Sequence, residues 1–279
     1  MGLFDETHEY SYSQLTSFDE CKYNFYLQRV EEIEEPLNNA FAERGSLIHD
    51  LLDMWSKKIL TKEEMLEEYE RRYSSDVQTA WPRMMASKGY AKKAYDEGIQ
   101  FLENFDEFKG YEVISTEEKF KIDLPLTDGS TRKFVGVIDM LLREERTGYL
   151  IICDHKSKKL SSFKKDEEKM YRQQYLYSMY FKEKYGKYPD CLMFHLFNEG
   201  GVKPQKYFSE QELKETLEWA SKQIKSIEEY SILDWLTCKD EPDFYCTELC
   251  GARKVCPVGM LPLGYKKRQT EEYKGYKEE

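Results

Sequence analysis

The chain has 279 residues, which is enough to bury a sizeable core in one large domain or two small ones. Aromatic residues make up 15% of it, which excludes a disordered chain although 34% of the residues are charged. The formal net charge of −11 argues against a protein that coats polyanions without specificity, and against a membrane-surface protein. It does not exclude a nucleic-acid enzyme, because such an enzyme needs only a local basic groove and metal ions.

The sequence also indicates where the protein works. No run is long enough to span a membrane, and the first ten residues lack the basic-then-apolar pattern of a signal peptide. We therefore expect an intracellular, cytoplasmic protein whose thiols stay reduced. Its seven cysteines then need an explanation other than disulfide bonds.

The chain up to about residue 110 is expected to be mainly helical. Ser13 is a plausible N-cap of a first helix that contains Cys21, and an acidic stretch at 31–36 ends that helix. Thr61 and Glu64 fit a capping box at the start of a third helix. The helices that follow the first are expected at 39–60, 61–77 and, after the break at Trp81-Pro82, 87–107.

From residue 111 onward, strand patterns appear. Two apolar runs, 134–142 and 149–153, flank a short polar segment that contains a glycine, and this arrangement predicts a β-hairpin. The other elements expected here are one or two strands at 111–124, a helix at 164–184, strands at 190–198 and 202–208, and a last helix from Ser209 to 236. This order predicts an α/β fold with the sheet in the middle of the chain.

The hairpin carries the first candidate site. Folding it between Arg146 and Thr147 places Asp139 opposite Asp154, and residues that face each other across strands lie only about 4.5–5.5 Å apart. Two like charges at that distance destabilise a sheet, unless a divalent cation such as Mg²⁺ or Mn²⁺ lies between them. Lys156, two residues after Asp154, faces the same side. The alternative is a surface hairpin with scattered charges.

Three polar side chains could complete such a site. The imidazole of His49 could join two carboxylates around a metal ion, or it could be a surface histidine that Asp53, one turn later, satisfies. Gln173 and Tyr177 are four residues apart on one helical face, with Gln174 as the alternative to Gln173. They could contact a phosphate or sugar edge, or form a structural polar patch.

A cysteine cluster is the remaining feature. Cys246, Cys250 and Cys256 fall within eleven residues of irregular chain, and thiolates at such spacing indicate an iron–sulfur cluster or a zinc site. A fourth ligand must come from elsewhere, and Cys21 and Cys238 are the candidates. Plain buried cysteines are the alternative.

The order of these motifs resembles a known family. They are Cys21, Gly45-x3-His49, Gly136-x2-Asp139, Asp154-x-Lys156, Gln173-x3-Tyr177 and the C-terminal cysteines. In this order they resemble the RecB-like branch of the PD-(D/E)XK nucleases, and more narrowly the iron–sulfur subgroup found in AddB-type helicase–nuclease subunits and CRISPR-associated RecB-like exonucleases. The differences are a Cys-x3-Cys spacing where Cys-x2-Cys is common, and His155 in the middle of Asp-x-Lys.

The resemblance implies a fold and a division of the chain. The fold is a restriction-endonuclease-like core, with a central mixed sheet flanked by helices. One nuclease domain would span 1–279, with a helical part at 10–110, the nuclease core at 111–236 and a cysteine-bearing tail at 237–264 that closes onto Cys21.

It also implies a role for each motif residue. His49, Asp139 and Asp154 would be metal ligands, with the carbonyl of His155 as a further one. Lys156 would position or activate the attacking water. Gln173 and Tyr177 would orient their helix against the DNA backbone. A [4Fe–4S] cluster, or less favourably zinc, would be held by Cys21, Cys246, Cys250 and Cys256.

The expected function is a Mg²⁺- or Mn²⁺-dependent DNA nuclease, an exonuclease in recombination, repair, phage replication or defence. It would be bacterial or phage-encoded, act on single strands or DNA ends, and work beside a helicase, recombinase or integrase. We expect Lys158, Lys159, Lys164 and Lys165 to attract DNA, and Phe163 and Tyr171 to stack on unpaired bases. The alternative is an inactive nucleic-acid-binding or adaptor protein on the same scaffold.

Overall fold

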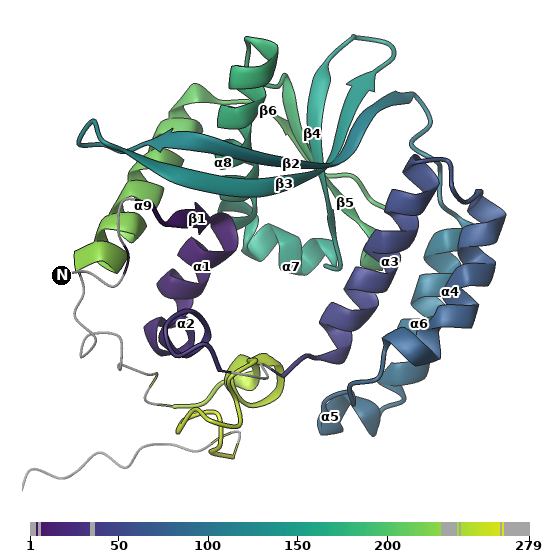
Figure 1. The fold of residues 1–279 in the computed structure, drawn as a ribbon. Helices are drawn as coiled ribbons and strands as arrows, with labels where there is room; N and C mark the ends of the chain where they lie inside the picture. Colours follow the sequence, from purple (N-terminus) through teal and green to yellow (C-terminus); the bar gives the residue numbers. More distant parts are fainter. Residues whose placement is uncertain are drawn as a thin grey trace, which may run out of the picture.

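A computed structural model describes residues 4, 7–33, 37–229, 239, 241–262 and 264. Within them, a six-stranded mixed sheet runs through the centre and helices pack on both of its faces (Figure 1). The strands are β1 (Glu9–Ser11), β2 (Tyr111–Pro125), β3 (Thr131–Glu144), β4 (Leu150–Lys156), β5 (Cys191–Leu196) and β6 (Gln205–Tyr207). The α/β fold with a central sheet is therefore confirmed.

The long strand β3 organises the sheet. Along one edge it pairs with β2 in antiparallel fashion over nearly its whole length. Its other edge has two successive partners, because the parallel strand β1 covers Lys133–Val135 and the antiparallel strand β4 covers Met140–Arg143. Residues 136–139 lie between these partners, in an interruption of the pairing on this edge. Beyond β4, the parallel strand β5 and then the antiparallel strand β6 complete the sheet.

The predicted hairpin register is confirmed. Met140 pairs with Cys153 and Arg143 pairs with Leu150, as folding between Arg146 and Thr147 requires. The ladder of paired residues stops at Met140, one pair before Asp139 and Asp154, which would be the next pair in the same register.

Helices cover both faces of the sheet because its strands are apolar on both sides. On one face, Met140 and Leu142 pack with α3 and its neighbours, and on the other Leu141 packs with α8 and α9, as the alternation of a strand requires. The helices are α1 (Tyr12–Glu20), α2 (Lys22–Arg29), α3 (Ala40–Ser56), α4 (Lys62–Asp76), α5 (Arg83–Ala86), α6 (Tyr90–Glu103), α7 (Leu160–Lys165), α8 (Glu167–Tyr185) and α9 (Glu210–Glu229). No helix among the described residues is both long and apolar enough to cross a membrane.

The first helix differs from the prediction. Ser11, not Ser13, is its N-cap, because the Ser11 side chain accepts a hydrogen bond from the Gln14 backbone while the Gln14 side chain accepts one from the Ser11 N–H. Cys21 does not lie inside a helix. It is extended (φ −160°, ψ 104°) between α1 and α2, and its thiol accepts from the Asn24 N–H at the start of α2. Strand β1 was not predicted.

Later boundaries also differ. The capping box of Thr61 and Glu64 is confirmed, whereas the helix expected at 164–184 is two helices that meet at Asp166. The strand expected at 190–198 ends at Leu196 and continues as the 3-10 turn η1 (Phe197–Glu199). The predicted end of the last helix, residue 236, lies outside the described residues, as does Cys238.

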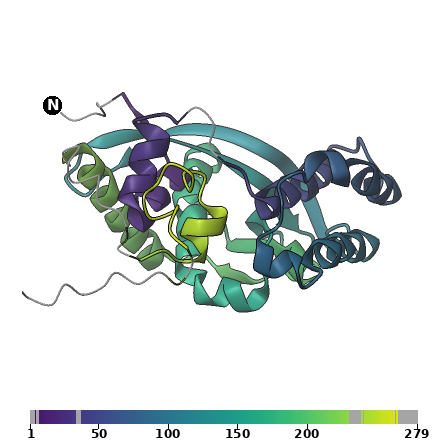
Figure 2. The same cartoon turned by 90° about the horizontal axis from the view of Figure 1, so that it is seen from below.

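The cysteine-bearing tail lies against the N-terminal helices. It includes a π-helical turn, η2 (Tyr245–Leu249), and Figure 2 shows it across α1 and α2. Cys250, Cys256 and their neighbours bury apolar surface against Leu27 of α2. The backbone N–H of Leu37 donates to the carbonyl of Gly251 over 2.9 Å. Segments more than 200 residues apart thus pack together.

Candidate active site

The predicted catalytic residues line one cleft. Its volume is about 950 Å³, and its walls come from β1, β2, β3, β4, α1, α3 and α8. Gly136, Val137 and Asp139 reach it because they lie where the edge of β3 passes from β1 to β4. The predicted site residues in its lining are His49, Asp139, Asp154, His155, Lys156, Gln173 and Tyr177.

Each of the two acids has its own partners. Asp139 Oδ2 accepts from the backbone N–H of His155 and lies 2.8 Å from both that nitrogen and His49 Nε2. Asp154 Oδ1 accepts from Gln173 Nε2 over 3.1 Å, and its Oδ2 lies 2.6 Å from Lys156 Nζ. These separate sets of partners let two like charges sit at neighbouring positions.

The same partners move the two pKa values apart. Burial raises the pKa of Asp154, and the charge of Asp139 raises it further. Burial also works to raise the pKa of Asp139, but the hydrogen bond and charge of His49 outweigh it and lower this pKa. Burial works to lower the pKa of Lys156, but the negative charges of Asp154 and Asp139 outweigh it and raise this pKa. Lys156 is therefore an ammonium group, suited to orienting water and stabilising negative charge rather than to taking up a proton.

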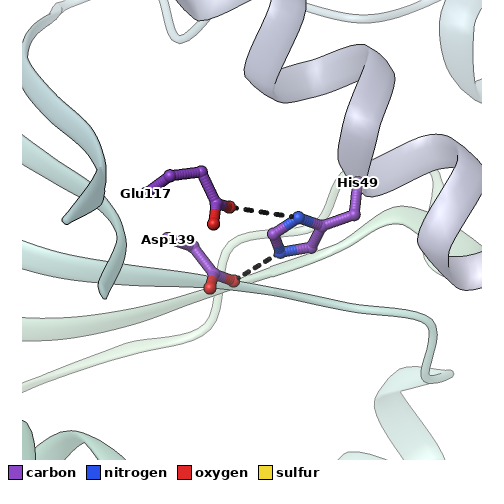
Figure 3. A group of neighbouring side chains, drawn as sticks. All are labelled: His49, Glu117 and Asp139. Carbon is purple, nitrogen blue, oxygen red and sulfur yellow. Dashed lines mark hydrogen bonds and ion pairs between the residues drawn. The ribbon is translucent and has the colours of Figure 1, made fainter. Parts of the chain in front are cut away.

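His49 brings α3 to the strands. Its Nε2 faces Asp139 and its Nδ1 lies 3.3 Å from Glu117 Oε1, so the imidazole sits between two carboxylates (Figure 3). Burial opposes its charge, but Asp139 and Glu117 outweigh it and raise the pKa of His49. Asp53 does not satisfy His49, because it pairs with Lys57 instead.

Glu117 is the site residue that sequence reasoning missed. It lies on β2, where Thr116 pairs with Met140 and Glu118 with Ile138, so Glu117 falls opposite Asp139. Thr127-Asp128-Gly129-Ser130 is a typical turn sequence between β2 and β3, and continuing the register from that turn to Asp139 leads to Glu117.

His49 and the two carboxylates beside it fit a divalent metal ion. One ligand atom each from His49, Glu117 and Asp139 lie within 4.8 Å of one another. Carboxylate oxygens with one imidazole suit Mg²⁺ or Mn²⁺, and a cation would offset the paired acids. His155 contributes its N–H to Asp139, while its ring lies edge-on to that of His49, with centroids 5.4 Å apart, and its Nδ1 is 2.9 Å from His195 Nδ1. Burial lowers the pKa of His155 to about 3, so it is neutral.

Of the two glutamines, Gln173 faces the site. Its Nε2 lies 3.1 Å from both Asp154 Oδ1 and the Tyr177 hydroxyl, so the i, i+4 pair on α8 is fastened to the buried acid. Gln174 is fully buried and donates to the carbonyl of Met193. It supports the contact of α8 with β5 instead.

The expected DNA contacts are partly wrong. Phe163 and Tyr171 are buried core residues, 1% and 2% exposed, so they cannot stack on bases. Lys158 pairs with Asp166 over 2.7 Å and Lys159 approaches Glu97 at 3.6 Å. The aromatic and basic side chains that do line the cleft are Tyr12, Phe120, Tyr177, Lys119, Lys121 and Lys156.

The four predicted cluster cysteines line a second pocket, of about 810 Å³. Cys21 contributes from the break between α1 and α2, and Cys246, Cys250 and Cys256 contribute from the tail. None of the four forms a disulfide bond among the described residues. Three thiols of the tail and one from the break between α1 and α2 therefore share this pocket, and thiolates are the ligands that soft metal centres prefer.

A mixed sheet that is flanked by helices and carries two acids and a lysine near the ends of adjacent strands defines the restriction-endonuclease-like class. The chain belongs to the PD-(D/E)XK nuclease superfamily, whose family model matches residues 9–257. Membership indicates a metal-dependent nuclease with a nucleic-acid substrate. No curated protein matches the sequence. A solved structure titled "Crystal structure of SSO0001" is similar over 88% of this chain and 96% of that chain, at 15% identity and a TM-score of 0.33.

Proposed function

We propose that this protein is a Mg²⁺- or Mn²⁺-dependent DNA nuclease that acts as an exonuclease. The observation that carries the proposal is the convergence of His49, Asp139, Asp154 and Lys156 at the interrupted edge of β3. The motif order, which resembles RecB-like exonucleases, supports DNA as the substrate.

Each residue has a role in this mechanism. His49, Asp139 and Asp154 would hold the metal ion, together with the carbonyl of His155. A bound divalent ion supplies Lewis acidity to the phosphate and lowers the pKa of a coordinated water. Lys156, held 2.6 Å from Asp154 Oδ2, orients the attacking water and stabilises the charge that develops on the phosphate.

Gln173 and Tyr177 keep Asp154 in place and present α8 to the DNA backbone. Lys119 on β2 supplies positive charge in the cleft, whereas Lys121 forms an ion pair with Glu9 in the same lining. Because the net charge of the chain is −11, the remaining surface repels DNA and leaves this cleft as the favourable path. Tyr12, which also lines the cleft and is only partly buried, offers a ring on which an unpaired base can stack, which favours single strands or DNA ends.

A [4Fe–4S] cluster on Cys21, Cys246, Cys250 and Cys256 is part of the proposal, with zinc as the less favoured occupant. Its support is the shared pocket of the four thiols. Its role is to fasten the tail to the break between α1 and α2. The proposed setting is DNA recombination, repair, phage replication or defence in a bacterial cytoplasm, beside a helicase, recombinase or integrase, as the motif resemblance implies.

A nuclease assay tests the activity. Linear single- and double-stranded DNA, labelled at the 5′ or 3′ end, should be shortened progressively with Mg²⁺ or Mn²⁺ and spared in EDTA. Asp154→Ala should abolish digestion, whereas Asp123→Asn, an exposed acid paired with Lys133, should not. Equal digestion by wild type and Asp154→Ala would refute the site, and metal-independent DNA binding without cleavage by the wild type would favour the adaptor alternative.

A further inference from the structure

Glu117 has an unusual backbone for its position. It lies inside β2 with φ of +47°, in the left-handed region, although it is neither glycine nor at a turn. Its neighbours Thr116 and Glu118 pair normally with β3, so the deviation is local. A glutamate held in this region is strained, and such strain persists where the surroundings enforce it, often at functional sites. The carboxylate so directed lies beside His49.

The two ring nitrogens of His49 face different partners. Nε2 lies 2.8 Å from Asp139, whose Oδ2 also accepts the His155 N–H next to Asp154, so Nε2 is on the side of the paired acids. Nδ1 lies 3.3 Å from Glu117 on β2 (Figure 3). A metal ion binds one ring nitrogen in the plane of the ring, and the other nitrogen then carries the proton.

We infer that Glu117 is a positioning residue, which accepts the Nδ1–H of His49 and so leaves Nε2 directed at the metal ion beside Asp139. This inference rests on the proposed metal site. Histidines that bind metals commonly donate their other N–H to a carboxylate, which fixes the tautomer and the ring orientation. With its Nδ1–H accepted by Glu117, His49 would keep Nε2 as the ring nitrogen available to the ion.

Metal affinity tests the inference without any nuclease assay. Calorimetric titration of the metal-free protein with Mn²⁺ should show about 10–100-fold weaker binding for Glu117→Ala, the usual cost of losing such a partner. Glu117→Gln should bind close to wild type, because its amide oxygen still accepts the Nδ1–H. Glu112→Ala, an exposed acid on the same strand that pairs with Arg143, is the control.

Two further measurements distinguish a positioning role of Glu117 from direct ligation of the metal ion. Glu117→Gly should weaken Mn²⁺ binding as Glu117→Ala does, yet raise the melting temperature, because glycine adopts positive φ without strain. Imidazole ¹⁵N spectra should show a protonated Nδ1 on His49 in the wild type with Mg²⁺ bound. Equal loss of affinity in Glu117→Gln and Glu117→Ala would overturn the inference in favour of direct ligation. Unchanged affinity in Glu117→Ala would also overturn it.

Failure of the proposed function gives a different pattern. If the wild type bound no Mn²⁺, the metal site itself would be wrong. The ¹⁵N spectra of the metal-free protein would still show whether Glu117→Ala alters the protonation of Nδ1 on His49.

Discussion

Replacing Gly136 by alanine should damage both the fold and the site. A Cβ built at Gly136 would lie 2.6 Å and 2.8 Å from ring atoms of Phe120 and 2.8 Å from Cε1 of Tyr177. Carbon atoms pack at about 3.5–4.0 Å, so these rings would have to retreat by roughly 1 Å. Phe120 has little room to do so, because it stacks on Tyr180 with ring centroids 4.7 Å apart.

The size of the effect follows from these contacts. Overpacking of this kind costs about 1–3 kcal/mol, and for a domain of this size each kcal/mol lowers the melting temperature by about 2–4 °C. A displaced Tyr177 would also release Gln173, which donates to Asp154. Misplacement of a catalytic group by about 1 Å can reduce the rate on the order of 10²-fold.

The assay combines thermal unfolding with single-turnover cleavage of labelled DNA. Gly45→Ala is the matched comparison, because Gly45 belongs to the motif around His49 but its Cβ would meet Ser157 Oγ at an ordinary 3.4 Å. In the helix α3, alanine should raise stability by about 0.5–1 kcal/mol and preserve cleavage. Wild-type stability and cleavage in Gly136→Ala would refute the packing argument. A loss of stability and cleavage in Gly45→Ala as large as in Gly136→Ala would show that the motif glycines are needed for a reason other than packing space.

Three further predictions concern single side chains outside Gly136 and Gly45. Burial raises the pKa of Asp154, so its contribution to the stability of the metal-free protein is full below the unfolded pKa of about 3.9 and is lost as the pH rises through the folded pKa. The wild type in EDTA should therefore lose stability towards pH 8 relative to Asp154→Asn, which urea unfolding at several pH values would show. Cys21→Ser should remove visible absorbance near about 400 nm from anaerobically purified protein, whereas Cys191→Ala in β5 should keep it, and a colourless wild type that contains zinc would contradict the cluster. Asn198→Ala should cost about 1.5–3 kcal/mol in urea unfolding, because Asn198 accepts from Nη1 of the buried Arg44, whose Nε and Nη2 have no hydrogen-bond partner in the described part of the chain. Additional replacement of Arg44 by methionine should recover much of that loss.

The acidic pair could be located from the sequence because the hairpin restricts its own register. Apolar residues must face both helical layers, and a short turn near Gly148 leaves one pairing of β3 with β4. Lys156 then follows from strand alternation alone. The position of His49 is different, because it depends on how α3 packs on the sheet. The residues alone left it open between a metal ligand and a surface histidine, and the motif resemblance favoured the ligand.

Other features were not predictable from local patterns. Strand β1 has three residues, too few for a periodic signal, and it forms because β3 offers an unpaired edge. Phe163 and Tyr171 follow basic residues in a polar stretch, yet both pack against Phe194 of β5. Burial of an aromatic side chain depends on the neighbouring strand, which the local sequence does not contain.

Helix α1 connects the two sites. Tyr12 and Ser13, at its start, line both the active-site cleft and the cysteine pocket. Strand β1 fixes this end of α1 to β3, and Cys21 follows its other end. Between these ends, Leu15 and Phe18 pack in the core, and Asp19 accepts from Trp219 and Gln223 of α9. One rigidly packed helix therefore forms part of the wall of both the cleft around Asp139 and Asp154 and the cysteine pocket.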